Sequence, residues 1–188
     1  MKSLQKLVSV DVYGSCGSLK CSKSKAGGDA GSHCYEMLER KYKFYLSWEN
    51  ALCNDYVTEK FFEVAKYNII PIVLNGADME EMAPKHSYIS VSDFDNLDDL
   101  VAYLHQVDND DSLFASYFWW REFYSVQDRH TSRHMSWCSL CSQLNGNQVD
   151  WNKERLLRLR STRNQTSNEP VDLFDYWVKQ AHCKPFTF

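Results

Sequence analysis

Apolar and polar positions alternate with a period of two, or run apolar without a break, in four short segments of the chain. These patterns predict β-strands at residues 8–12, 44–48, 69–74 and 88–91. The segment at 69–74 is apolar throughout and ends at Asn75-Gly76, which is typical of a strand buried on both faces of a parallel sheet. Pro71 is then expected near the start of that strand.

Apolar positions at helical spacing lie between and after these strands. They predict helices at residues 34–40, 59–67, 97–107, 112–126, 151–160 and 171–181. Thr58 is the expected N-cap of the helix at 59–67, and Asp93 or Asp95 would cap the helix at 97–107. Residues 128–152 carry loop signals.

The aromatic residues Phe118, Trp119 and Trp120 lie at helical spacing in the segment 112–126. They could form a stacking platform for a sugar, but aromatic residues in this pattern more often pack in a core. We therefore expect them in the core.

Alternation of strands and helices predicts an α/β fold, in which a Rossmann-like parallel sheet is flanked by helices. Ligands bind such sheets beyond the carboxyl ends of the strands. Polar candidates gather at one such end. They are Glu49 and Asn50 after a strand, Tyr56 in a loop, and Thr58, Glu59 and Lys60 where a helix opens.

These polar residues at the strand end have two interpretations. The backbone N–H groups at a helix start, with the Lys60 ammonium beside them, suit a phosphate or diphosphate, and Glu59 suits sugar hydroxyls. By its pattern alone, the simpler interpretation is that Thr58 is only a cap, Glu59 complements the helix dipole and Lys60 is a solvated surface lysine.

Composition narrows the function. Lysine and arginine number 21 against 25 acidic residues, and the net charge of -4 makes nucleic acid an unexpected partner. No apolar stretch is long enough to cross a bilayer, and the first residues lack a signal-peptide core. Seven cysteines and the glycan acceptor pattern at Asn164 nevertheless favour an oxidising compartment. We therefore expect that the natural N-terminus is missing.

Residues 10–126 resemble the C-terminal donor-binding domain of the α1,3-fucosyltransferases of glycosyltransferase family 10. The invertebrate and plant type that modifies the core of N-glycans is the most similar, judged by the cysteine pattern and WCSLC at 137–141. The matching segments are DVYGSCG at 11–17, YKFYLSWENALCNDYVTEKFF at 42–62, IIPIVLNGA at 69–77, APKHSYI at 83–89 and YFWWREFY at 117–124.

The resemblance implies a donor substrate, GDP-fucose, and an inverting transfer of fucose in α1,3 linkage to N-acetylglucosamine of N-glycans. Lys60 would neutralise the diphosphate, while Asn50, Tyr56 and Glu59 would hold the fucose and nucleoside. No divalent metal is expected to be required, and the acidic run at residues 108–111 is interpreted as a solvated loop. Trp48, Ala51 and Asn75 differ from the usual Phe, Ser and Gly of the family, and none of these changes removes the site.

The implied architecture is the C-terminal half of a GT-B glycosyltransferase. Residues 1–127 would form the donor-binding domain and residues 128–188 an extension. The family's phosphate-binding arginine and general base, the acceptor domain and the membrane anchor would lie in missing segments. The implied protein is a type II membrane protein of the Golgi lumen. We expect negligible transfer by this chain alone; a non-catalytic nucleotide-sugar-binding fragment or a pseudoenzyme is the alternative.

The cysteines leave several pairings open. Cys16, Cys21 and Cys34 are disulfide candidates, Cys53 could pair or be free, and Cys183 could pair with a missing domain or be free.

Cys138 and Cys141 form a CxxC that follows His130 and His134, which allows a zinc site and a small zinc-stabilised domain. The tight spacing of these four residues, together with the disulfide that the resembling family forms there, favours a Cys138–Cys141 disulfide.

Overall fold

The computed structural model describes residues 2–21, 32–127, 129–145 and 183 of the chain. The described residues fall into two compact units. The first contains the residues up to Val126 together with Cys183, and the second begins at Gln127 and is described as far as Asn145. Asn164 and the two helices expected after residue 150 lie outside the described residues.

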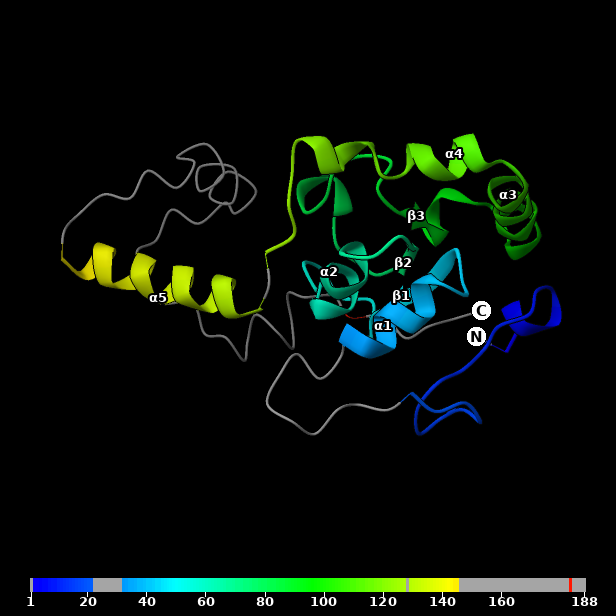
Figure 1. The fold of residues 1–188 in the computed structure, drawn as a ribbon, viewed down its shortest axis with the longest axis horizontal. Helices are drawn as coiled ribbons and strands as arrows, with labels where there is room; N and C mark the ends of the chain where they lie inside the picture. Colours follow the sequence, from blue (N-terminus) through cyan, green and yellow to red (C-terminus); the bar gives the residue numbers. More distant parts are fainter. Residues whose placement is uncertain (1, 22–31, 128, 146–182, 184–188) are drawn as a thin grey trace. The chain divides into compact units, whose positions relative to one another are not determined.

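A three-stranded parallel sheet forms the centre of the first unit (Figure 1). Its order is β1 (Phe44–Trp48), β2 (Ile70–Leu74) and β3 (Ile89–Ser90). Phe44 is opposite Ile70, and Ile72 is opposite Ile89. All five residues of β2 are buried, with Pro71 second in the strand, as the uninterrupted apolar run predicted. The α/β fold class is thereby confirmed.

Helices cover both faces of the sheet (Figure 1). On one face, Ile70, Ile72 and Leu74 pack with residues of α3 (Leu97–Asn109), and α4 (Asp111–Ser116) follows it. On the other face, Val73 packs with α2 (Glu59–Ala65), which shares a further cluster with α1 (Ser32–Glu39). Successive side chains of a strand point to opposite faces, and this alternation decides which helix each residue of β2 meets.

Short 3-10 helices complete this unit. They are η1 (Leu4–Lys6), η2 (Met79–Glu81), η3 (Val91–Asp93) and η4 (Trp119–Glu122). The strand predicted at residues 8–12 is absent, and only an isolated bridge between Tyr13 and Leu19 follows it. The prediction was wrong because alternation shows a half-buried segment, whereas a strand also needs a hydrogen-bonded neighbour.

Two helix predictions need correction. The N-cap of α3 is Asn96, whose side chain accepts a hydrogen bond from the backbone of Asp99, rather than Asp93 or Asp95. The single helix predicted at 112–126 is α4 followed by η4. Tyr117, the C-cap residue of α4, is buried, and its hydroxyl lies 2.6 Å from that of Tyr103.

The expected burial of the aromatic segment holds for only part of it. Trp120 is buried and Phe118 packs partly buried against the core, as expected. Trp119 is exposed, contrary to expectation.

The second unit contains α5 (Arg129–Leu144), where a loop was predicted. The polar composition of this segment suggested the loop, but it contains neither glycine nor proline before Gly146, so nothing in it interrupts a helix. Trp137, Leu140 and Leu144 are exposed apolar side chains of this helix.

Candidate functional site

Glu49 is the first residue after β1, and its carboxylate is the centre of a buried polar cluster. Its backbone N–H donates to the carbonyl of Leu74, so it lies beside the end of β2. Its side chain is 1% exposed. Oε1 accepts a hydrogen bond from the backbone N–H of Thr58 at 2.7 Å, and the Thr58 hydroxyl lies 2.9 Å from both carboxylate oxygens. The buried charge is thus well supplied with donors.

Lys60 completes this cluster. Its Nζ donates to Glu49 Oε2 at 2.8 Å and to Thr58 Oγ1 at 3.1 Å. The hydrogen bond to Glu49 raises the pKa of the ammonium, an effect that desolvation partly opposes. An ammonium has three N–H donors, and these contacts use two of them. Because the Lys60 side chain is 30% exposed, the third donor can reach a ligand in solvent.

Thr58 is the N-cap residue of α2, as predicted, but its side chain acts differently from a usual cap. It makes no capping hydrogen bond to the helix backbone and binds Glu49 instead. The Ser47 hydroxyl donates to the carbonyl of Lys60 at 3.2 Å. Both contacts join the first turn of α2 to the end of β1.

Arg121 holds the other end of α2. Its guanidinium donates to the carbonyl oxygens of Ala65 and Tyr67 and to Asn68 Oδ1. Burial lowers the pKa of this guanidinium. The helix is therefore fixed at both ends, because donors at its C-terminus bind carbonyls that have no partner within the helix. The sequence patterns did not identify Arg121 as a residue that holds α2. The only sign of its role was its position as a single arginine within the aromatic run at 117–124.

The remaining predicted site residues lie around this cluster. Tyr56 is half-buried and Glu59 is exposed, and both lie close enough to Lys60 to raise the pKa of its ammonium further. Asn50 is exposed directly after Glu49. The structure therefore brings Glu49, Thr58 and Lys60 into direct contact.

Comparison with models of known protein families identifies the family of this chain. Residues 1–158 match the model described as "Glycosyltransferase family 10 (fucosyltransferase) C-term". The chain belongs to glycosyltransferase family 10. This is a family of fucosyltransferases, which are hexosyltransferases.

Curated relatives support the family assignment. The chain is 42% identical over 141 residues to alpha-(1,3)-fucosyltransferase C of Drosophila melanogaster, a match that covers 75% of this chain and 31% of the relative. It is 39% identical over 186 residues to glycoprotein 3-alpha-L-fucosyltransferase A of the same organism, with 96% and 32% covered. A 4-galactosyl-N-acetylglucosaminide 3-alpha-L-fucosyltransferase of Gorilla gorilla gorilla is 37% identical over 146 residues, with 76% and 37% covered. The family 10 chain spans about a third of the length of these relatives.

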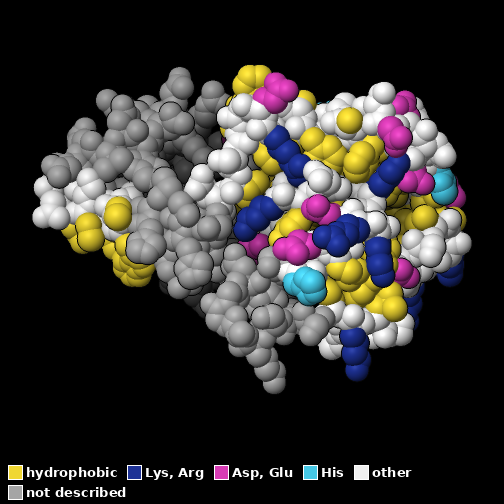
Figure 2. Space-filling view, viewed as in Figure 1, with side chains coloured by type: hydrophobic (Ala, Val, Ile, Leu, Met, Phe, Trp, Pro, Cys, Tyr) yellow, Lys and Arg dark blue, Asp and Glu magenta, His cyan; other side chains and the backbone are white. Residues whose placement is uncertain are grey.

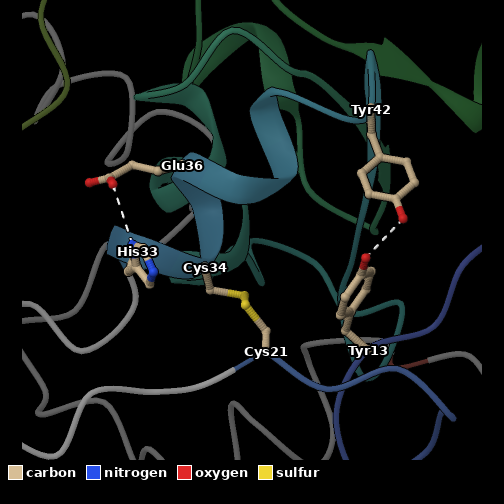
Figure 3. The surroundings of a disulfide bond; sticks show 6 residues. All are labelled: Tyr13, Cys21, His33, Cys34, Glu36 and Tyr42. Atoms are coloured by element: carbon tan, nitrogen blue, oxygen red, sulfur yellow. Dashed lines mark hydrogen bonds and ion pairs between the residues drawn. A yellow bond between two sulfur atoms is a disulfide. The ribbon is translucent and has the colours of Figure 1, made fainter.

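One disulfide of this family 10 chain ties its N-terminal loop to α1 (Figure 3). Cys21 is bonded to Cys34, so two of the three clustered candidates form a pair, while Cys16 is free and exposed. Beside this bond, the hydroxyls of Tyr13 and Tyr42 point toward each other at 2.9 Å, and Tyr42 also donates to Asp11. These contacts attach residues 11–21 to the folded unit.

A second disulfide joins Cys53 to Cys183, 130 residues apart. The sequence left both residues open and did not suggest this pair. The bond fixes the loop between β1 and α2, which also packs against the turn after β2. A Cβ at Gly76 would lie 2.6 Å from the carbonyl oxygen of Cys53, so only glycine fits at this position without a shift.

In this family 10 chain Cys138 and Cys141 are free and exposed on α5, in contrast to the expected disulfide. Both residues lie within the continuous helix α5, so the helical backbone fixes the directions of their side chains, and the two sulfur atoms are not bonded. The side chains of His130 and His134 lie outside the described set. Among the residues that are described, no group of three or more His, Cys, Asp or Glu could hold a metal ion.

The surface of the described part has mixed charge. Figure 2 shows basic and acidic side chains next to one another on one face of it. The acidic run at 108–111, expected to be a solvated loop, instead forms the end of α3, the N-cap Asp110 and the start of α4. Lys43 contacts Asp111 at 3.1 Å and Asp108 at 3.7 Å, so part of the run is in ion pairs. No helix within the described ranges is long and apolar enough to span a membrane.

Proposed function

We propose that this chain forms the GDP-fucose-binding part of an α1,3-fucosyltransferase, in which Lys60 binds the diphosphate of the donor. The observation that carries the proposal is the Lys60 ammonium, held by Glu49 and Thr58 at the carboxyl end of β1, with hydrogen bonds from two of its three N–H donors among the described residues. This is the end of a parallel sheet at which ligands bind. Membership of family 10 supports the same donor.

The cluster suits the charge that develops when fucose leaves the diphosphate. Leaving-group departure places negative charge on the diphosphate oxygens, and a preorganised cation stabilises that charge more than the ground state. The raised pKa keeps Lys60 protonated throughout the physiological range. Because Lys60 supplies a cation, donor binding needs no divalent metal in this proposal.

Glu49 acts in this proposal as a positioning residue rather than as a ligand of the sugar. Its carboxylate is buried and bound by the Thr58 backbone, the Thr58 hydroxyl and Lys60. These contacts hold the lysine side chain in one place, which reduces the entropy lost when the donor binds. Asn50, Tyr56 and Glu59 surround the cluster and are proposed to contact the fucose and nucleoside.

The proposed acceptor is an N-acetylglucosamine hydroxyl in the core of N-glycans, and the proposed compartment is the Golgi lumen. The relative that covers 96% of the chain is named as a glycoprotein 3-alpha-L-fucosyltransferase, which supports a glycoprotein acceptor. The two disulfides are typical of an oxidising compartment. Inverting transfer also needs a general base, and none of the described contacts identifies one.

Calorimetric titration of the oxidised chain with GDP-fucose tests the proposal. The parent is expected to bind saturably, with or without EDTA. Lys60→Ala should weaken binding by roughly tenfold to a hundredfold, as expected for the loss of a charge-assisted contact.

Lys66→Ala is the matched control. Lys66 lies just after the same helix and pairs with Glu63 at 3.3 Å, so its substitution makes the same change in charge away from the cluster. Circular dichroism must show that all three proteins are folded. A folded parent that does not bind GDP-fucose, or equal loss of binding in both variants, would contradict the proposal.

A further inference from the structure

A pocket of about 270 Å³ lies beside β3 in the first unit. It is lined by residues that lead into and follow β3, by Tyr103 of α3 and by Tyr117 after α4. No residue of the Glu49, Thr58 and Lys60 cluster lines it. Its volume is just below the roughly 300–1,000 Å³ typical of sites for drug-sized ligands, which suits a single small ring.

Two tyrosine hydroxyls supply polar groups in this pocket. The hydroxyls of Tyr103 and Tyr117 lie 2.6 Å apart, and one proton suffices for the hydrogen bond between them. The other O–H can therefore donate to a ligand. The ring of His86 stacks on that of Tyr117 with 3.9 Å between centroids, and His86 Nε2 lies 2.8 Å from the Ser116 hydroxyl. These contacts give the pocket a fixed aromatic wall.

The charges of the lining do not favour a phosphate or a nucleotide. Lys85, the one lysine of the lining, is bound by Glu80 at 2.8 Å. Partial desolvation lowers the pKa of the exposed His86 side chain, so its imidazole is neutral at neutral pH. Asp93 adds a second carboxylate that makes no ion pair within the described part of the chain. Two carboxylates against one paired ammonium leave this lining with a net negative charge.

We propose that this pocket binds an uncharged pyranose ring of a glycan. Sugar hydroxyls would donate to the Asp93 carboxylate and accept from the free tyrosine O–H. The apolar face of the ring would lie against the aromatic side chains of the pocket, which include Phe94 and Tyr103. Phe94 and Tyr103 already contact each other, with ring centroids 5.5 Å apart. This proposal concerns a second site and does not depend on the donor site.

Saturation-transfer NMR with the 188-residue chain tests it. The probes are the methyl glycosides of N-acetylglucosamine, mannose and L-fucose, each titrated separately, with GDP as an anionic comparison. At least one glycoside is expected to bind saturably and to remain bound when GDP is added. Asp93→Asn should raise its Kd about tenfold, because a hydrogen bond to a charged acceptor is lost, and Tyr103→Phe should also raise it.

Asp95→Asn is the matched control, since Asp95 is an exposed acid two residues away that does not line the pocket. Thermal unfolding shows whether each variant is folded. Lys60→Ala should leave glycoside binding unchanged, which separates this site from the donor site. The absence of binding by all three glycosides, or binding that Asp93→Asn and Tyr103→Phe leave unaltered, would overturn the proposal.

Discussion

Lys60 Nζ lies 2.8 Å from Glu49 Oε2, and this pair connects the end of β1 to the first turn of α2. The carboxylate is almost completely buried and the ammonium is partly exposed. A buried charge needs its partners, because removal of one leaves the other desolvated and unpaired. The pair therefore links the stability of the fold to the proposed donor site.

Glu49→Gln should therefore reduce both stability and donor binding. The substituted amide keeps only one acceptor oxygen, so its NH2 group must face either the Lys60 ammonium or the backbone N–H of Thr58. We expect a loss of about 2–4 kcal/mol in the free energy of unfolding and roughly tenfold weaker binding of GDP-fucose. Urea unfolding and calorimetry measure the two effects. Glu81→Gln, at an exposed position, should change neither; unchanged stability of Glu49→Gln would refute the buried pair.

Arg121→Met should loosen α2 at its C-terminal end. The apolar stem would still pack on Phe118, whose ring lies 4.6 Å from the guanidinium, while the donors to Ala65, Tyr67 and Asn68 are lost. We expect about 1–3 kcal/mol of destabilisation and weaker binding of GDP-fucose. Arg40→Met, at an exposed position, is the control. Equal unfolding midpoints for the two variants would show that Arg121 does not hold the helix.

Cys183→Ser should destabilise the first unit. The Cys53–Cys183 bond closes a long loop, and its removal increases the conformational entropy of the unfolded chain. We expect a loss of about 2–5 kcal/mol, seen as a lower midpoint in thermal unfolding without reductant. Cys138→Ser changes a free thiol and should leave the midpoint unaltered. Mass spectrometry after digestion without reduction should find the Cys53–Cys183 peptide pair, and a different partner for either residue would contradict the structure.

Stability should fall in mild acid because of His86. Partial desolvation lowers the pKa of this exposed imidazole below its ordinary value of 6.5, so the unfolded state binds a proton more readily than the folded state. The contribution is fully present above pH 6.5 and is lost as pH falls through the folded pKa. His86→Asn suits the positive φ of 56° and should show a smaller drop in unfolding midpoint between about pH 7.5 and about pH 5.5. An equal drop in both proteins would assign the acid sensitivity to other groups.

The sequence by itself determined the elements that frame the site. The strand at 44–48, the buried strand at 69–74 and the helices after Thr58 and Asn96 follow from the period of apolar residues, which is a local property. The meeting of Glu49 with Thr58 and Lys60 could also be anticipated, because a strand end and the next helix start lie at the same edge of a parallel sheet.

Only the tertiary structure decided the role of each side chain within that frame. It buried Glu49 beneath Lys60, paired Cys53 with a cysteine 130 residues away and placed Arg121 at the end of α2. The pocket beside β3 likewise combines segments that are separate in the sequence. Such contacts depend on which faces of distant elements pack together, and no local periodicity contains that information, because burial and partner choice are properties of the assembled core.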